Sequence, residues 1–149
     1  MKKIFLILLL LISFSCNNDP MKKILNRNNE LCGSMIDKST KFIKVYTVDI
    51  NFYYEYSLNI CKIEQNEFAN KVIEKTISNT LKLKINSVEE FKIIAENGYN
   101  IIFKYNCDDG RKIAEINFEY INGNFKYIRQ ESIWNESVDL MFEGLNSQK

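Results

Sequence analysis

Few side chains in this chain of 149 residues have types and spacing that could support catalysis. Cys107 is the sharpest thiol candidate, because we expect it to end a strand opposite Lys112, and a nearby ammonium group favours the reactive thiolate. Asp108-Asp109 could supply half of a calcium site, or one of the two carboxylates of a glycoside hydrolase. Glu89-Glu90 could form a catalytic carboxylate pair.

Each of these candidates also has a structural explanation, which we favour. Asp109-Gly110 is a preferred two-residue hairpin loop, in which Asp bonds to its own backbone. Ser87 to Glu90 matches a capping box, with Ser87 as N-cap and Glu90 reaching back to it, whereas Glu89 faces solvent. For Cys107 we expect a disulfide or an inert buried thiol.

Other residue types are absent or scattered, and this excludes several classes of site. The chain has no histidine, which removes Ser-His-Asp and Cys-His nucleophiles and the imidazole-rich zinc sites. It has no C-x-x-C spacing and no glycine-rich phosphate loop. Without Lys2 and Lys3, 18 basic residues face 19 acidic ones, so nothing attracts nucleic acid. We expect no metal site and no cofactor.

Two turn sequences, Asp109-Gly110 and Asn122-Gly123, divide residues 101–128 into three segments of alternating apolar and polar side chains. Both dipeptides suit two-residue loops because they tolerate positive φ. The sequence therefore predicts a three-stranded antiparallel meander, in a register that buries one apolar face. The expected pairs are Cys107–Lys112, Asn106–Ile113, Tyr105–Ala114, Phe103–Ile116, Ile101–Phe118, Phe118–Tyr127 and Tyr120–Phe125.

The rest of the chain alternates between helical and strand periodicity. Residues 41–60 read as a hairpin that turns near Asp49, or as a single long bent strand. Together these elements predict an α+β domain, with an antiparallel sheet of about five strands (an N-terminal hairpin plus the C-terminal meander) and helices packed on one face. The expected helices are Pro20 to Cys32 with Asp19 as N-cap and Gly33 as stop, residues 67–83, Ser87 to Asn97, and a C-terminal helix containing Trp134, Val138, Met141, Phe142 and Leu145.

The first residues have the features of an export signal. Lys2 and Lys3 precede an apolar run over residues 4–14, which is shorter than the roughly 20 residues of a membrane span. The run ends at Ser13-Phe14-Ser15-Cys16 and resembles a bacterial lipoprotein signal peptide. The resemblance implies cleavage before Cys16, a diacylglycerol on its sulfur, an acyl chain such as palmitate on its amino group, and a cell-membrane or outer-membrane location.

The same residues leave a second outcome open. Ser13 and Ser15 also fit ordinary secretory cleavage, after which the protein would be periplasmic or secreted. In both cases we expect residues 1–15 to be a signal peptide and residues 16–149 to form a single domain.

The expected state of the cysteines depends on whether the protein is exported. With Cys16 acylated, Cys32, Cys61 and Cys107 remain, and an oxidising compartment permits one disulfide and one free thiol. A Cys32–Cys61 bridge would contribute roughly 3–4 kcal/mol by closing a loop of about 30 residues. Alternatively, all three are buried as small hydrophobic residues.

One group of residues suggests an interaction surface. The parity of Tyr53 places it opposite the expected core face, where it could form an exposed patch with Ile113 and Ile128. The segments Met35 to Thr40, Tyr54 to Leu58 and Gly98 to Tyr105 loosely resemble small exported bacterial proteins of unknown function, which implies a fold and no activity.

Two functional hypotheses follow. In the first, the chain is a lipid-anchored, non-catalytic binding module of the cell envelope that contacts a protein partner, as an inhibitor or immunity protein does. In the second, it is a small envelope enzyme that uses carboxylates or a lone thiol.

Overall fold

The structure, a computed structural model, describes residues 19–59 and 67–128. The expected signal peptide (1–15), Cys16, Cys61 and the expected C-terminal helix with Trp134 lie outside these residues. The elements are α2 (Pro20–Glu30), β1 (Thr40–Val48), β2 (Asn51–Leu58), α3 (Glu67–Lys84), the 3₁₀ turn η2 (Ile85–Ser87), α4 (Glu89–Glu96), β3 (Asn100–Cys107), β4 (Lys112–Ile121) and β5 (Asn124–Ile128).

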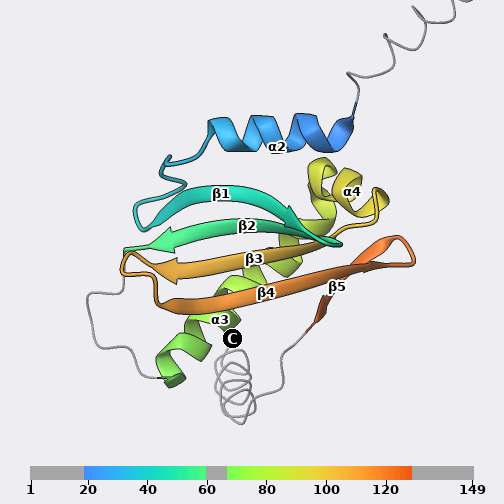
Figure 1. The fold of residues 1–149 in the computed structure, drawn as a ribbon. Helices are drawn as coiled ribbons and strands as arrows, with labels where there is room; N and C mark the ends of the chain where they lie inside the picture. Colours follow the sequence, from blue (N-terminus) through green and yellow to red (C-terminus); the bar gives the residue numbers. More distant parts are fainter. Residues whose placement is uncertain (1–18, 60–66, 129–149) are drawn as a thin grey trace, which may run out of the picture.

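The five strands form one sheet in the order β1-β2-β3-β4-β5 (Figure 1). The α+β class with a five-stranded sheet is confirmed, and the sheet is mostly antiparallel, but β2 and β3 pair in parallel, which the prediction did not include. The connection from β2 to β3 contains α3, η2 and α4. A connection of this length can return the chain to the end from which β2 started, whereas a tight turn cannot.

The β4–β5 hairpin follows the predicted register. Asn122 and Gly123 have φ of 52° and 81°, the left-handed conformation that a two-residue loop requires. Phe118 pairs with Tyr127, and Tyr120 with Phe125, as expected. Strands β1 and β2 also form a hairpin, so the long bent strand is wrong. Its turn contains Asp49 at φ 52°.

The β3–β4 hairpin differs from the prediction at its tip. The Cys107 amide donates to Arg111 O at 2.7 Å, so the loop has three residues, Asp108 to Gly110, rather than two. Asn106 then pairs with Lys112, and Ile113 is left out of the ladder as a bulge. A three-residue loop with a residue at positive φ is the next most common hairpin, and Gly110 (φ 86°) provides that residue.

The bulge restores the predicted pairs further along the hairpin and moves one side chain. Tyr105 pairs with Ala114, and Phe103 with Ile116, as expected. The expected pairs Cys107–Lys112 and Asn106–Ile113 are wrong. Because the bulge turns its side chain inward, Ile113 is 6% exposed and belongs to the core.

The core lies on one face of the sheet, where the described helices pack. Phe103 is at its centre, with its ring 5.4 Å from that of Tyr54, 5.6 Å from that of Phe91 and 6.0 Å from that of Phe118. Full burial of each such side chain contributes about 1.5–3 kcal/mol. The helices contribute Met21, Ile24, Leu25, Ile73, Ile77, Leu81, Phe91, Ile93, Ile94 and Ala95 to this core.

Helix α2 begins as predicted but ends earlier. The Asp19 carboxylate accepts from the Met21 amide at 2.9 Å, and Pro20 occupies the first helical position. The helix ends at Glu30 rather than at Cys32, and Leu31 is its C-cap. The amide of Gly33 instead donates to Phe42 O at 2.8 Å, so the chain here already runs along the edge of β1.

Candidate functional site

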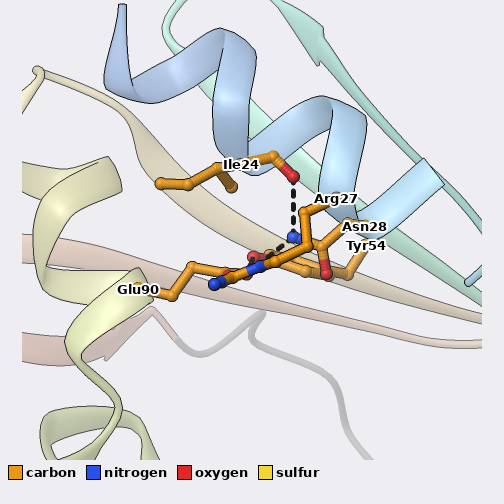
Figure 2. Close-up of polar contacts among 5 residues, drawn as sticks. All are labelled: Ile24, Arg27, Asn28, Tyr54 and Glu90. Atoms are coloured by element: carbon orange, nitrogen blue, oxygen red, sulfur yellow. Dashed lines mark hydrogen bonds and ion pairs between the residues drawn. The ribbon is translucent and has the colours of Figure 1, made fainter. Parts of the chain in front are cut away.

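The Glu90 carboxylate, on α4, joins three elements at the core face. The Tyr54 hydroxyl from β2 donates to Glu90 Oε1 at 2.5 Å, and Asn28 Nδ2 from α2 donates to the same oxygen at 2.8 Å. Arg27, also on α2, forms an ion pair with Glu90 Oε2. Figure 2 shows these side chains converging from the helices and the sheet. We call Arg27, Asn28, Tyr54 and Glu90 the Glu90 cluster.

The hydrogen bonds and the ion pair of the Glu90 cluster stabilise the packing of α2 against α4 and the sheet. Burial raises the pKa of Tyr54, with a smaller contribution from Tyr56, and these effects outweigh the opposing charge of Arg27. Tyr54 therefore stays a neutral donor. Hydrogen bonds to a charged acceptor contribute about 1.5–3 kcal/mol each. The Glu90 side chain is 14% exposed and faces donors from both neighbouring elements, so it holds α2 against α4 and the sheet.

The sequence prediction for Glu90 was wrong. The N-cap of α4 is Val88, in extended conformation, and no side chain caps the helix. Ser87 instead donates its hydroxyl to Lys84 O at 2.7 Å, so no capping box forms. The signal that could have identified Glu90 is Tyr54, because a tyrosine on a core face needs a partner for its hydroxyl.

The opposite face of the sheet, the outer face, carries no described helix. One row of side chains crosses all five strands here, since consecutive register pairs connect its members. The rings of its first two residues stack with centroids 4.9 Å apart and an interplanar angle of 8°. This row, called the Tyr46 row, consists of Tyr46, Tyr53, Ile102, Asn117 and Ile128.

A row of alternating charge runs beside the Tyr46 row. Register pairs align Lys44, Glu55, Lys104 and Glu115 on neighbouring strands. Lys104 Nζ lies 4.6 Å from the centroid of the Tyr53 ring, and Lys44 Nζ lies 4.9 Å from that of Tyr46. Each cation–π contact contributes about 0.5–1 kcal/mol at an exposed site. Lysine ammonium groups therefore lie near the faces of both rings.

Lys104 remains charged at neutral pH. Burial lowers its pKa, but the hydrogen bond to the Tyr46 hydroxyl at 3.4 Å and the electrostatic interactions with Tyr46, Glu115 and Tyr53 raise it, with a net upward shift. The surface is thus built from fixed contacts between charged and aromatic side chains.

The structure places the three residues of the predicted patch differently. Tyr53 lies on the outer face as expected, half-buried against Tyr46. Ile128 is 37% exposed and belongs to the same row, two strands beyond Ile102. Ile113 lies in the core, so its place in the patch is wrong. Sequence reasoning missed Tyr46 and Lys104, whose positions depend on the β1–β2 register and on the parallel β2–β3 pair.

The cysteines have different states. Cys107 is 3% exposed and disulfide-bonded, and its partner lies outside the described residues. Cys32 is exposed and free, so a Cys32–Cys61 bridge is not formed. Because its sulfur is in a disulfide, Cys107 has no thiol to act as a nucleophile.

The two aspartates of the β3–β4 tip have structural partners. Asp109 accepts from the Arg111 amide at 3.1 Å and from Arg111 Nε at 2.8 Å, and these bonds lower its pKa. Asp108 accepts a hydrogen bond from the Ser57 hydroxyl. Within the described ranges, no three His, Cys, Asp or Glu side chains lie close enough together to hold a metal ion.

An open pocket of about 540 Å³ lies beside this tip. Its lining is mixed, with two apolar side chains among polar and charged ones. The lining residues are Met35, Ser39, Lys41, Ile43, Ser57, Asn59 and Asp108.

Comparison with known proteins shows the fold alone. No family model and no curated protein matches the chain. A crystal structure of a Pseudomonas aeruginosa protein, described as a "putative secreted protein", has a similar fold with a TM-score of 0.54. The two sequences are 8% identical, and the match covers 66% of this chain and 84% of that chain. In residues 19–59 and 67–128, no helix has the length and apolar character needed to span a bilayer.

Proposed function

We propose that the protein is an exported, lipid-anchored module of the cell envelope that binds a protein partner through the outer face of its sheet. Its role is that of a non-catalytic inhibitor or immunity protein. The lipid is carried by Cys16, and the described domain presents the binding surface.

The Tyr46 row and its neighbouring charged row are the observation that carries this proposal. Aromatic side chains are enriched in protein interfaces, because they bury a large area with few rotatable bonds. The row crosses five strands, on a face that the described helices leave uncovered. Lys44 pairs with Glu55 at 3.5 Å, and Lys112 with Glu115 at 3.1 Å. Charges held in place in this way favour one partner over others.

Three independent observations support export. The N-terminus has a basic region, a short apolar run and a cysteine. The disulfide at Cys107 is a bond that persists in oxidising compartments and is rare in the cytosol. The Pseudomonas aeruginosa protein with a similar fold is described as a "putative secreted protein".

The alternative enzymatic hypothesis has lost its thiol candidate. The form of this hypothesis that uses a thiol named Cys107 as the sharpest candidate, and Cys107 is buried and disulfide-bonded. Nothing observed at the aspartates of the hairpin tip favours catalysis over turn formation, since both are held by neighbouring side chains.

The binding proposal is tested by affinity capture from the solubilised envelope, with the full chain as bait. We expect a stoichiometric partner with the wild-type protein. Tyr53→Ala and Lys104→Gln, on the outer face, should each lower its recovery at least tenfold. Thr76→Ala on α3 is the matched control, since its side chain is exposed on the helical side. Equal recovery with all four proteins, or no partner after crosslinking, would reject the proposal.

The lipid anchor is tested separately by the intact mass of the protein extracted from membranes. We expect a chain that begins at Cys16 and carries the added mass of a diacylglycerol and an acyl group. A chain without added lipid, recovered from the soluble fraction, would contradict the anchor and leave the binding surface standing.

A further inference from the structure

Basic charge is concentrated in the first part of the described domain. Residues 19–41 contain five basic and three acidic side chains, whereas the other described residues, 42–59 and 67–128, contain 10 basic and 11 acidic ones. Lys22 and Lys23 on α2 are exposed, and so is Lys38 in the α2–β1 connection. The segment that contains α2 and the α2–β1 connection therefore carries a net positive charge, and the other described residues do not.

Three large apolar side chains are exposed in the same stretch. Leu31 is 52% exposed, Met35 is 55% exposed and Ile36 is 58% exposed. Their segment is held by backbone hydrogen bonds to β1, among them Phe42 N to Ser34 O at 2.9 Å and Ile36 N to Thr40 O at 2.8 Å. The apolar side chains thus project from a connection that is pinned along the edge strand.

Helix α2 and this connection lie together on the β1 side of the domain (Figure 1). Exposed apolar residues accompanied by lysines have the composition of an interfacial membrane-binding surface. The apolar groups enter the boundary of the acyl region, and each lysine gains about 1 kcal/mol near anionic headgroups. We define the α2–β1 surface as Lys22, Lys23, Leu31, Met35, Ile36 and Lys38.

We propose that the α2–β1 surface docks onto the anionic phospholipid headgroups of the membrane that holds the lipid anchor. This inference rests on the proposed function, because the anchor brings the surface to the bilayer. Only three residues separate Cys16 from the start of α2 at Pro20. Even if this segment were fully extended, the distance from Cys16 to Pro20 would be no more than roughly 14 Å.

Docking through α2 would orient the whole domain. The Glu90 cluster fixes α2 to α4 and to β2, so the helix and the sheet move together. Because β1 and β5 are the two edges of the sheet, β5 would lie about 19 Å farther from the bilayer than β1. The Tyr46 row would then run outward from the membrane, with the outer face open to a partner from the side.

The test uses the native free thiol of Cys32, which adjoins Leu31 and is exposed. The full lipidated chain, labelled there with a fluorophore, is reconstituted in vesicles of phosphatidylethanolamine and phosphatidylglycerol that contain a nitroxide-lipid quencher. The matched control is a Cys32→Ser/Lys126→Cys double variant, labelled at an exposed position on β5. We expect the Cys32 probe to be quenched at least threefold more strongly than the probe at position 126. In the Lys22→Glu/Lys23→Glu variant, this difference should fall by half or more.

Flotation of the same vesicles separates the two claims. A chain that floats, but whose probes are quenched equally at positions 32 and 126, overturns the docking and leaves the anchor intact. A chain that does not float refutes the anchor, and the docking is refuted with it. Circular dichroism of the lysine variant, whose changes are on exposed positions, confirms that a loss of quenching reflects docking and not unfolding.

Discussion

At the scale of single residues, Glu90 shows that a local sequence motif does not reveal hydrogen bonds to residues far away along the chain. The spacing of Ser87 and Glu90 fits a capping box, a local motif that needs no information about the rest of the chain. In the structure, Glu90 instead bonds to Tyr54 and Asn28, which are 36 and 62 positions away along the chain. Local patterns could not reveal these bonds, because they depend on how α2 and α4 pack over β2.

The Glu90 cluster predicts a specific loss of stability. Glu90→Ala should lower the free energy of unfolding by about 2–3 kcal/mol, because it leaves the buried Tyr54 hydroxyl without its acceptor and removes one of the two bonds of Asn28 Nδ2, which keeps only Ile24 O at 2.9 Å. Glu89→Ala, on an exposed neighbour, should change it by less than about 0.5 kcal/mol. Urea denaturation measures both.

A double-mutant cycle provides the control for this prediction. Tyr54→Phe removes one donor to Glu90, so its effect should largely disappear when Glu90 is already alanine. Additive effects of Tyr54→Phe and Glu90→Ala would show that the hydroxyl and the carboxylate do not interact.

The buried tyrosines predict a loss of stability at alkaline pH. Burial raises the pKa of Tyr56 to about 12 and also raises the pKa values of Tyr54 and Tyr105. In the unfolded chain these hydroxyls ionise near pH 10. The stability they contribute is therefore complete below pH 10 and falls as the pH rises toward 12, by about 1.4 kcal/mol per pH unit for each tyrosine.

Urea denaturation between pH 8 and pH 11 measures this slope. Tyr56→Phe should reduce it, because phenylalanine does not ionise. Ionisation of all tyrosines near pH 10 in the native protein, seen by absorbance at 295 nm, would contradict the prediction.

At the scale of elements, the two glycine turns show when a register can be predicted. Asn122-Gly123 forms its loop as its sequence indicates, because both residues adopt positive φ. At the other turn, Asp108 joins the loop and bonds to Ser57 of β2, a contact that no hairpin rule contains. That difference of one residue moves Ile113 from the expected patch into the core.

The Asn122-Gly123 turn predicts the effect of a conformational substitution. Gly123 has φ of 81°, and no other side chain or backbone atom lies within 4 Å of the place a Cβ would take. Gly123→Ala should therefore cost about 1 kcal/mol through backbone strain alone. Gly123→Asn is the matched comparison, since asparagine tolerates this region, and it should cost less. Thermal denaturation compares the two; an equal loss would show that the strain lies elsewhere.

At the scale of the whole molecule, the α+β class can be predicted from the sequence. How the β1–β2 hairpin pairs with the meander of β3, β4 and β5 cannot be predicted from it. Each hairpin specifies its own apolar face, and together they indicate helices on one side of a sheet. The sequence of neither hairpin specifies which of its edge strands pairs with an edge strand of the other hairpin. The parallel β2–β3 pair decides this, and through it Tyr53 lies next to Ile102 and Glu55 next to Lys104. The outer face is therefore a product of tertiary structure.

Binding through the outer face is the central claim, and site-specific photo-crosslinking in living cells tests it most directly. A photoreactive residue in place of Lys126 lies on the outer face, and one in place of Thr76 lies on the exposed side of α3. We expect position 126 to give a single protein adduct that is absent at position 76 and lost in the Tyr53→Ala background. Adducts at position 76 alone, or none at either position, would contradict the claim.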